Sequence, residues 1–94
     1  MLIIDTREPM EYNMGHVEGA INISPMKFMA GSVPEELANT PKDEEIILYC
    51  VSGSRSNVVG HILRQFGFTN ITNGINRVIT HISHHSRYRH RSVF

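Results

Sequence analysis

The chain has 94 residues, of which 40% are hydrophobic and 19% charged, and its nine basic and nine acidic residues cancel to a net charge of zero. This length suits one domain with a single core, and no apolar run reaches the roughly 20 residues of a membrane helix. Acidic side chains near the start argue against a secretory signal, and the lone cysteine, Cys50, excludes an internal disulfide and favours a cytoplasmic location.

Three short apolar stretches and a fourth stretch with a weaker pattern are predicted to be strands. They are Leu2–Ile4, Ala20–Ile23, Ile46–Tyr49 and Asn70–Thr72.

Helical segments are predicted between these strands, over Pro9–Asn13, Met26–Ala30, Ser32–Asn39, residues 56–66 and Asn76–Ile82. Thr6 is the expected cap of the first helix, and Ser32 with Glu35 has the spacing of a capping box. The helix over 56–66 is the clearest, because its apolar residues fall on one face and Gly67 supplies a stop. The residues of that face are Val58, Val59, Ile62, Leu63 and Phe66.

Strands that alternate with helices predict an α/β fold, a doubly wound parallel sheet of four to five strands with helices on both faces. Sites in such sheets form at the carboxyl ends of the strands. Asp5 and Cys50 both follow an apolar run. We therefore expect Asp5, Arg7 and the segment after Cys50 to converge at one edge.

The segment after Cys50 has the composition of a thiolate-activating loop, with Val51, Ser52, Gly53 and Ser54 leading to Arg55 and a helix. Loop amides and the positive helix end would point at the sulfur, and Arg55 would add a full charge. Such surroundings lower a thiol pKa from about 8.5 to roughly 3.5–7.5. We expect Cys50 to be a nucleophile, although a lone cysteine after a strand is often only a buried structural thiol.

Three stretches resemble the rhodanese family of single-domain sulfurtransferases. They are Leu2–Glu8, with Asp5-Thr6-Arg7-Glu8; Glu11–Ile23, with Gly15-His16-Val17 and Gly19-Ala20-Ile21-Asn22; and the loop Tyr49–Ser56. The resemblance covers about residues 2–75, and Asn73-Gly74 stands where the family has Gly-Gly.

The resemblance implies a rhodanese-like domain over 1–80 and sulfur transfer from thiosulfate or a similar small anionic donor through a Cys50 persulfide. It implies no metal or organic cofactor, and an acceptor that is a thiol or dithiol protein such as a thioredoxin-like protein. An alternative is a persulfide carrier, sensor or protein-binding module without turnover. Phosphatase or arsenate chemistry fits less well, because only four residues separate Cys50 from Arg55 and the loop is narrow for a phosphoryl group.

The other site residues have structural alternatives. Arg55 is expected to stabilise the thiolate and bind the donor, or else to pair with a carboxylate. Val51, Ser52, Gly53, Ser54 and Ser56 are the expected substrate-binding loop. Ser52 and Ser54 can donate to sulfonate-type oxygens, whereas Ser56 has the alternative role of a helix cap. Asp5 is expected to hold loop amides or an arginine, and Arg7 either contributes to the anion site or pairs with an acid.

Residues 46–94 contain six arginines and no acid, which suits an anionic substrate. The end of the chain, 81–94, is predicted to be a frayed basic tail rich in His and Arg. Its His81, His84 and His85 have helical spacing, but no carboxylate or second cysteine accompanies them, so no metal site is predicted. No nucleic-acid module and no membrane segment is recognised.

Overall fold

The computed structural model describes the backbone of residues 1–50, 54–74 and 88–90, with the side chains of the first two ranges. Four parallel strands form a sheet in the order β3-β1-β4-β5. These strands are β1 (Leu2–Asp5), β3 (Ile21–Asn22), β4 (Ile46–Tyr49) and β5 (Ile71–Asn73). The parallel α/β sheet predicted from the sequence is confirmed, and each predicted strand matches one of the four within two residues.

The register brings the carboxyl ends of these strands to one edge. Asp5 lies opposite both Asn22 and Tyr49, and Leu48 lies opposite Asn73. Cys50 directly follows Tyr49, so the edge that carries Asp5 also carries the cysteine. The expected convergence of these two strand ends is confirmed.

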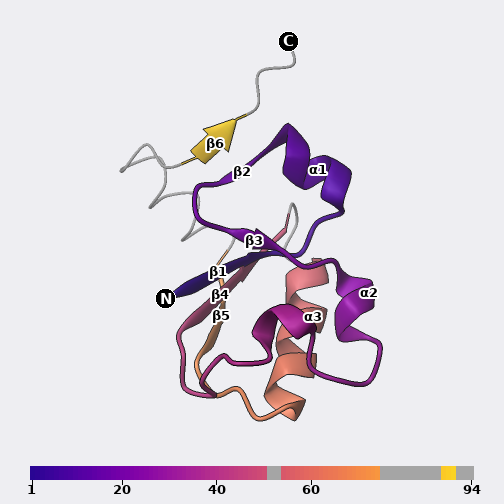
Figure 1. The fold of residues 1–94 in the computed structure, drawn as a ribbon, viewed down its shortest axis with the longest axis vertical. Coiled ribbons are helices and arrows are strands. Elements are labelled where there is room, and N and C mark those ends of the chain that lie inside the picture. The colour runs from indigo at the N-terminus through magenta and orange to yellow at the C-terminus, as the bar shows by residue number, and fades with distance from the viewer. Residues whose placement is uncertain (51–53, 75–87, 91–94) are drawn as a thin grey trace.

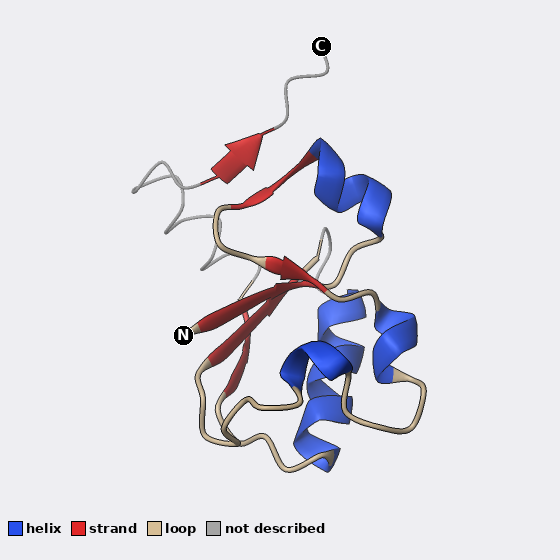
Figure 2. Ribbon diagram, viewed as in Figure 1, coloured by secondary structure: helices blue, strands red, loops and turns tan. Residues whose placement is uncertain are grey.

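Helices α2 (Pro25–Phe28) and α3 (Ser54–Gln65) and the 3-10 helix η1 (Glu35–Leu37) lie on one side of the sheet, as Figure 2 shows. The main core forms between these helices and the sheet. Its fully buried members are Ile4, Ile23, Phe28, Leu37, Ile46, Leu48, Val59, Leu63 and Phe68. Leu63 and Val59 fall on the predicted apolar face of α3, whereas Val58 is 44% exposed and does not belong to it.

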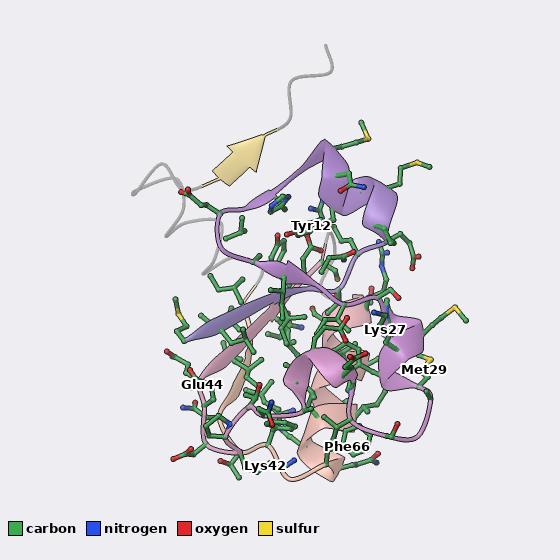
Figure 3. The ribbon with its side chains drawn as sticks, in the orientation of Figure 1. Tyr12, Lys27, Met29, Lys42, Glu44 and Phe66 are labelled. Carbon is green, nitrogen blue, oxygen red and sulfur yellow. The ribbon has the colours of Figure 1, made fainter. Side chains whose placement is uncertain are left out.

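The opposite side of the sheet is covered by α1 (Pro9–Met14) and the short strand β2 (Gly15–Val17), which lie together in Figure 1. A smaller cluster of Val17, Ala20 and Tyr49 packs here. Figure 3 shows Tyr12 between α1 and the sheet, where its hydroxyl donates to the Ala20 carbonyl at 2.7 Å. The expectation of helices on both faces therefore holds.

A two-stranded antiparallel pair of β2 with β6 (Tyr88–His90) was not predicted. Three-residue strands carry almost no periodicity, and the pairing joins segments that are far apart in the chain. The sequence suggested a frayed segment where β6 lies. The helix expected over Asn76–Ile82 falls outside the described residues.

Two predicted caps were wrong. Thr6 does not cap α1, because its buried hydroxyl donates to the Tyr49 carbonyl at 3.0 Å. The N-cap of α1 is Glu8, whose backbone N–H donates to Glu11 Oε1 at 2.8 Å. Ser32 is not the N-cap of η1, because η1 begins at Glu35 and its N-cap is Pro34. Gly67, by contrast, ends α3 as predicted, with a φ of 97° that a side chain would strain.

No helix in the described part of the chain is long and apolar enough to span a membrane.

Candidate active site

Cys50 lies at the carboxyl end of β4 as a buried thiol that forms no disulfide, and only 2% of the residue is exposed. The apolar run Ile46–Tyr49 places it there, because β4 is the strand between β1 and β5 and its side chains are largely buried. Val51, Ser52 and Gly53, the expected amide cradle, lie outside the described residues. Helix α3 begins directly after them, at Ser54, two residues earlier than predicted.

Ser56 lies inside the first turn of α3 and is fully buried. Its hydroxyl donates to Asn73 Oδ1 at 2.8 Å, and its Oγ lies 3.7 Å from Cys50 Sγ. The prediction that Ser56 caps a helix was therefore wrong: the helix begins two residues earlier, and the side chain turns towards the sulfur and β5. Ser54, the first residue of α3, is exposed.

Arg55 pairs with Glu11 of α1, a residue that the sequence analysis did not single out. Its Nη1 donates to Glu11 Oε1 at 2.9 Å and its Nη2 donates to Oε2 at 3.3 Å. The bond to Glu11 raises the pKa of Arg55, and the charge of Cys50 raises it further to a smaller extent. Arg55 is thus close enough to Cys50 to feel its charge, while the carboxylate pairing anticipated as the alternative is also present.

The pKa of Glu11 is lowered from its ordinary value, chiefly by the hydrogen bond from Arg55 and then by the Glu8 N–H. Glu8 and Glu11 form a capping box in the structure, but the sequence signature of that motif begins with Ser or Thr and not with Glu. The Arg55 partner, however, lies 44 residues away and has no local signature.

Asp5 is completely buried and holds the turn after β1 together. Its carboxylate accepts the backbone N–H of Arg7 at 2.9 Å, the Arg7 guanidinium at 2.7 Å and the Tyr49 hydroxyl at 2.8 Å. Asn22 adds two bonds from its amide, to the carbonyls of Asp5 and Arg7. Asp5 therefore has the structural role expected of it, and Arg7 takes the acid-pairing alternative.

Tyr49 links this network to β2, because its hydroxyl also accepts the backbone N–H of Val17 at 3.1 Å. Burial raises the pKa of Tyr49 well above its ordinary value, so it remains a neutral donor to Asp5. Sequence reasoning read Tyr49 only as part of an apolar strand.

His16 and His61 are the histidines whose side chains the structure describes. His16 stacks on Tyr12 with ring centroids 3.7 Å apart, and His61 is exposed on α3. Within residues 1–50 and 54–74, no group of three His, Cys, Asp or Glu side chains is arranged to hold a metal ion. His81, His84 and His85 lie outside the described residues.

The site thus combines a cysteine at a strand end with an Asp-x-Arg turn at the neighbouring strand end. A comparison with known protein families agrees with this arrangement. The sequence model of the rhodanese-like domain matches residues 1–77. The chain belongs to the rhodanese-like family.

Similar proteins agree with this assignment. This rhodanese-like domain is 38% identical over 72 residues to "Thiosulfate sulfurtransferase PspE" of Escherichia coli, covering 74% of this chain and 64% of that protein. It is 32% identical over 73 residues to a "Sulfurtransferase" of Allochromatium vinosum, covering 78% and 64%. Both alignments thus span somewhat less than two thirds of the relative's length.

A solved structure described as "rhodanese with anions from E. coli" has a TM-score of 0.64 and 31% identity, covering 74% of this chain and 79% of that one. The fold and the order of elements are therefore those of the rhodanese-like family.

Proposed function

We propose that this rhodanese-like domain is a sulfurtransferase in which Cys50 carries the transferred sulfur. The observation that carries the proposal is the placement of the lone cysteine at the carboxyl end of β4, beside Ser56 and within the field of Arg55. The names of the two sulfurtransferase relatives support it.

In the first half-reaction, the Cys50 thiolate attacks the outer sulfur of thiosulfate. A new Sγ–S bond forms, the S–S bond of thiosulfate breaks, and sulfite leaves with the bonding electron pair. The product is a persulfide on Cys50.

In the second half-reaction, a thiophilic acceptor attacks the outer sulfur and the Sγ–S bond breaks, which regenerates the thiolate. With cyanide the product is thiocyanate. In the cell we propose a thiol or dithiol protein, such as a thioredoxin-like protein, as acceptor, because the chain has no second cysteine to resolve the persulfide. A lone cysteine working as a thiol also favours the reducing cytoplasm.

The anionic donor needs positive charge, and Arg55 is the candidate in the described part of the site. Its guanidinium donates two hydrogen bonds to Glu11, but 38% of the Arg55 side chain remains exposed and can be reached by a donor. The loop Val51–Ser54 would add backbone amides and serine hydroxyls. No metal or organic cofactor is required by this chemistry. We propose a rhodanese-like domain over residues 1–80 that is followed by the basic segment 81–94, of which Tyr88–His90 pairs with β2.

The test is thiocyanate formation from thiosulfate and cyanide by wild type and by Cys50→Ser. We expect turnover with wild type and none with the variant, whose melting temperature should match because serine is nearly isosteric. Release of phosphate from aryl phosphates by wild type but not by Cys50→Ser would point to phosphatase chemistry instead. A stable persulfide without thiocyanate formation would point to a carrier.

A further inference from the structure

Three polar groups connect the ends of β4, α3 and β5. Cys50 Sγ lies 3.7 Å from Ser56 Oγ, and Ser56 Oγ donates to Asn73 Oδ1 at 2.8 Å. Cys50 and Ser56 are both buried, so the contact between them forms away from bulk water, whereas Asn73 at the end of β5 is exposed. A hydrogen bond at such a site is worth more than one at the surface.

The hydroxyl of Ser56 has one proton to donate and lone pairs to accept with. When its proton points to Asn73, the side towards Cys50 presents lone pairs. This arrangement suits a neutral thiol, whose S–H can donate to Oγ. A thiolate has no proton, so it would face those lone pairs unfavourably, and the hydroxyl must turn its proton towards the sulfur.

An asparagine at position 73 permits both arrangements, because its amide holds an acceptor oxygen and a donor nitrogen. With Oδ1 towards Ser56, the amide accepts the hydroxyl proton. After half a rotation, Nδ2 donates to Oγ, and the hydroxyl proton is released towards the sulfur. A carboxylate at this position could only accept, and it would keep the proton away from Cys50.

We propose that Ser56 donates a hydrogen bond to the Cys50 thiolate and that Asn73 is the positioning residue that sets the direction of its hydroxyl. This inference rests on the proposed function, in which the Cys50 thiolate is the nucleophile that the Ser56 hydroxyl would stabilise.

Other charged and titratable groups surround this strand end. In the described part of the chain they are Arg55 on α3, Asp5 and Arg7 at the end of β1, Tyr49 on β4, Glu8 and Glu11 at α1, and His16 on β2. β5 contributes no charged side chain. Since substitution of Ser56 by alanine or threonine changes none of these charges, comparison of these variants isolates the hydroxyl.

The experiment measures the rate of Cys50 alkylation by iodoacetamide against pH, with no sulfur donor present. We expect Ser56→Ala to raise the midpoint by about one pH unit, which corresponds to about 1.4 kcal/mol. Ser56→Thr, which keeps a hydroxyl, should stay near the wild-type midpoint. The matched control is Asn57→Ala, because Asn57 is the next residue of α3 and is exposed, and it should change nothing.

Asn73→Asp tests the positioning role. It should raise the midpoint by at least one unit, partly because a carboxylate repels the thiolate whatever Ser56 does. The same substitution in the Ser56→Ala background measures that repulsion alone. We expect the shift there to be no more than half as large, and the difference is the coupling between the two residues.

An unchanged midpoint in a folded Ser56→Ala variant would overturn the proposal, and so would equal Asn73→Asp shifts in both backgrounds. If Ser56→Ala does not fold, the isosteric variants Ser56→Thr and Ser56→Val decide: the midpoint must hold in the first, which keeps a hydroxyl, and rise in the second, which lacks one. The midpoint requires no turnover. Absence of thiocyanate formation would therefore contradict the proposed function, while the alkylation midpoints would still test the role of Ser56. An unchanged midpoint would contradict the role of Ser56, while thiocyanate formation would still support the proposed function.

Discussion

Replacement of Arg55 by alanine removes the cation that the proposed mechanism uses for the donor. The residue is in the first turn of α3, with Nη1 2.9 Å from Glu11 Oε1 and 38% of the side chain exposed. Its pKa is raised in part by the charge of Cys50, which places it within electrostatic reach of the sulfur. The variant should therefore bind thiosulfate less well and react with it more slowly.

The size of the loss follows from this geometry. A hydrogen bond from a charged donor contributes about 1.5–3 kcal/mol. Because Arg55 is more than one third exposed and already shares its charge with Glu11, solvent and the carboxylate reduce that contribution. We expect about 1.4 kcal/mol, a tenfold fall in kcat/KM for thiosulfate.

The assay is thiocyanate formation with thiosulfate and, in parallel, with an uncharged organic trisulfide as donor. The loss should be much smaller for the uncharged donor, and Arg55→Lys should recover only part of the rate, since an ammonium lacks the planar fork. Arg64→Ala is the matched control, because Arg64 lies in the last turn of the same helix. Unchanged kcat/KM in Arg55→Ala, or an equal loss in Arg64→Ala, would refute the reasoning.

Three further predictions concern the residues around the site. Glu11→Gln should lower the KM for thiosulfate about twofold by removing the carboxylate that competes for Arg55, and a raised KM would contradict this role. The pKa of Glu11 is lowered from its ordinary value of 4.5, chiefly by the hydrogen bond from Arg55. The stabilisation by the Glu11–Arg55 pair is therefore complete above that value and declines as the pH falls below it. The difference in unfolding free energy between wild type and Glu11→Gln, measured by urea unfolding, should shrink below about pH 4. Asp5→Asn should cost about 3 kcal/mol in unfolding free energy, because it leaves the partly buried Arg7 without its buried counter-charge, and a loss under about 1 kcal/mol would show that the network is not structural.

The parallel sheet could be predicted because β1 and β4 are continuous apolar runs and α3 has a clear 3.6-residue period. The carboxyl-edge position of Cys50 and Asp5 followed from that topology alone. The antiparallel strands β2 and β6 could not be predicted, since three residues are too few for a period and their partners are distant in sequence. Val58 fits the apolar period of α3 but is 44% exposed, because only part of that face meets the sheet.

The sequence singled out individual candidate residues but not the pairs that they form. Cys50, Arg55, Ser56, Asp5 and Arg7 were singled out as candidates, and the structure brings them to one edge. Glu11 and Asn73 were missed as partners. Glu11 contacts Arg55 across 44 residues of sequence, and Asn73 contacts Ser56 across 17. Side-chain pairing over such separations leaves no local pattern in a single sequence.

The central claim is that Cys50 carries the transferred sulfur, and the mass of the intact protein tests it most directly. After incubation with thiosulfate and removal of small molecules, wild type should gain about 32 Da, the mass of one sulfur atom, and lose it on addition of cyanide. Cys50→Ser should gain nothing under the same conditions. An unchanged wild-type mass, or an equal gain in Cys50→Ser, would contradict the account.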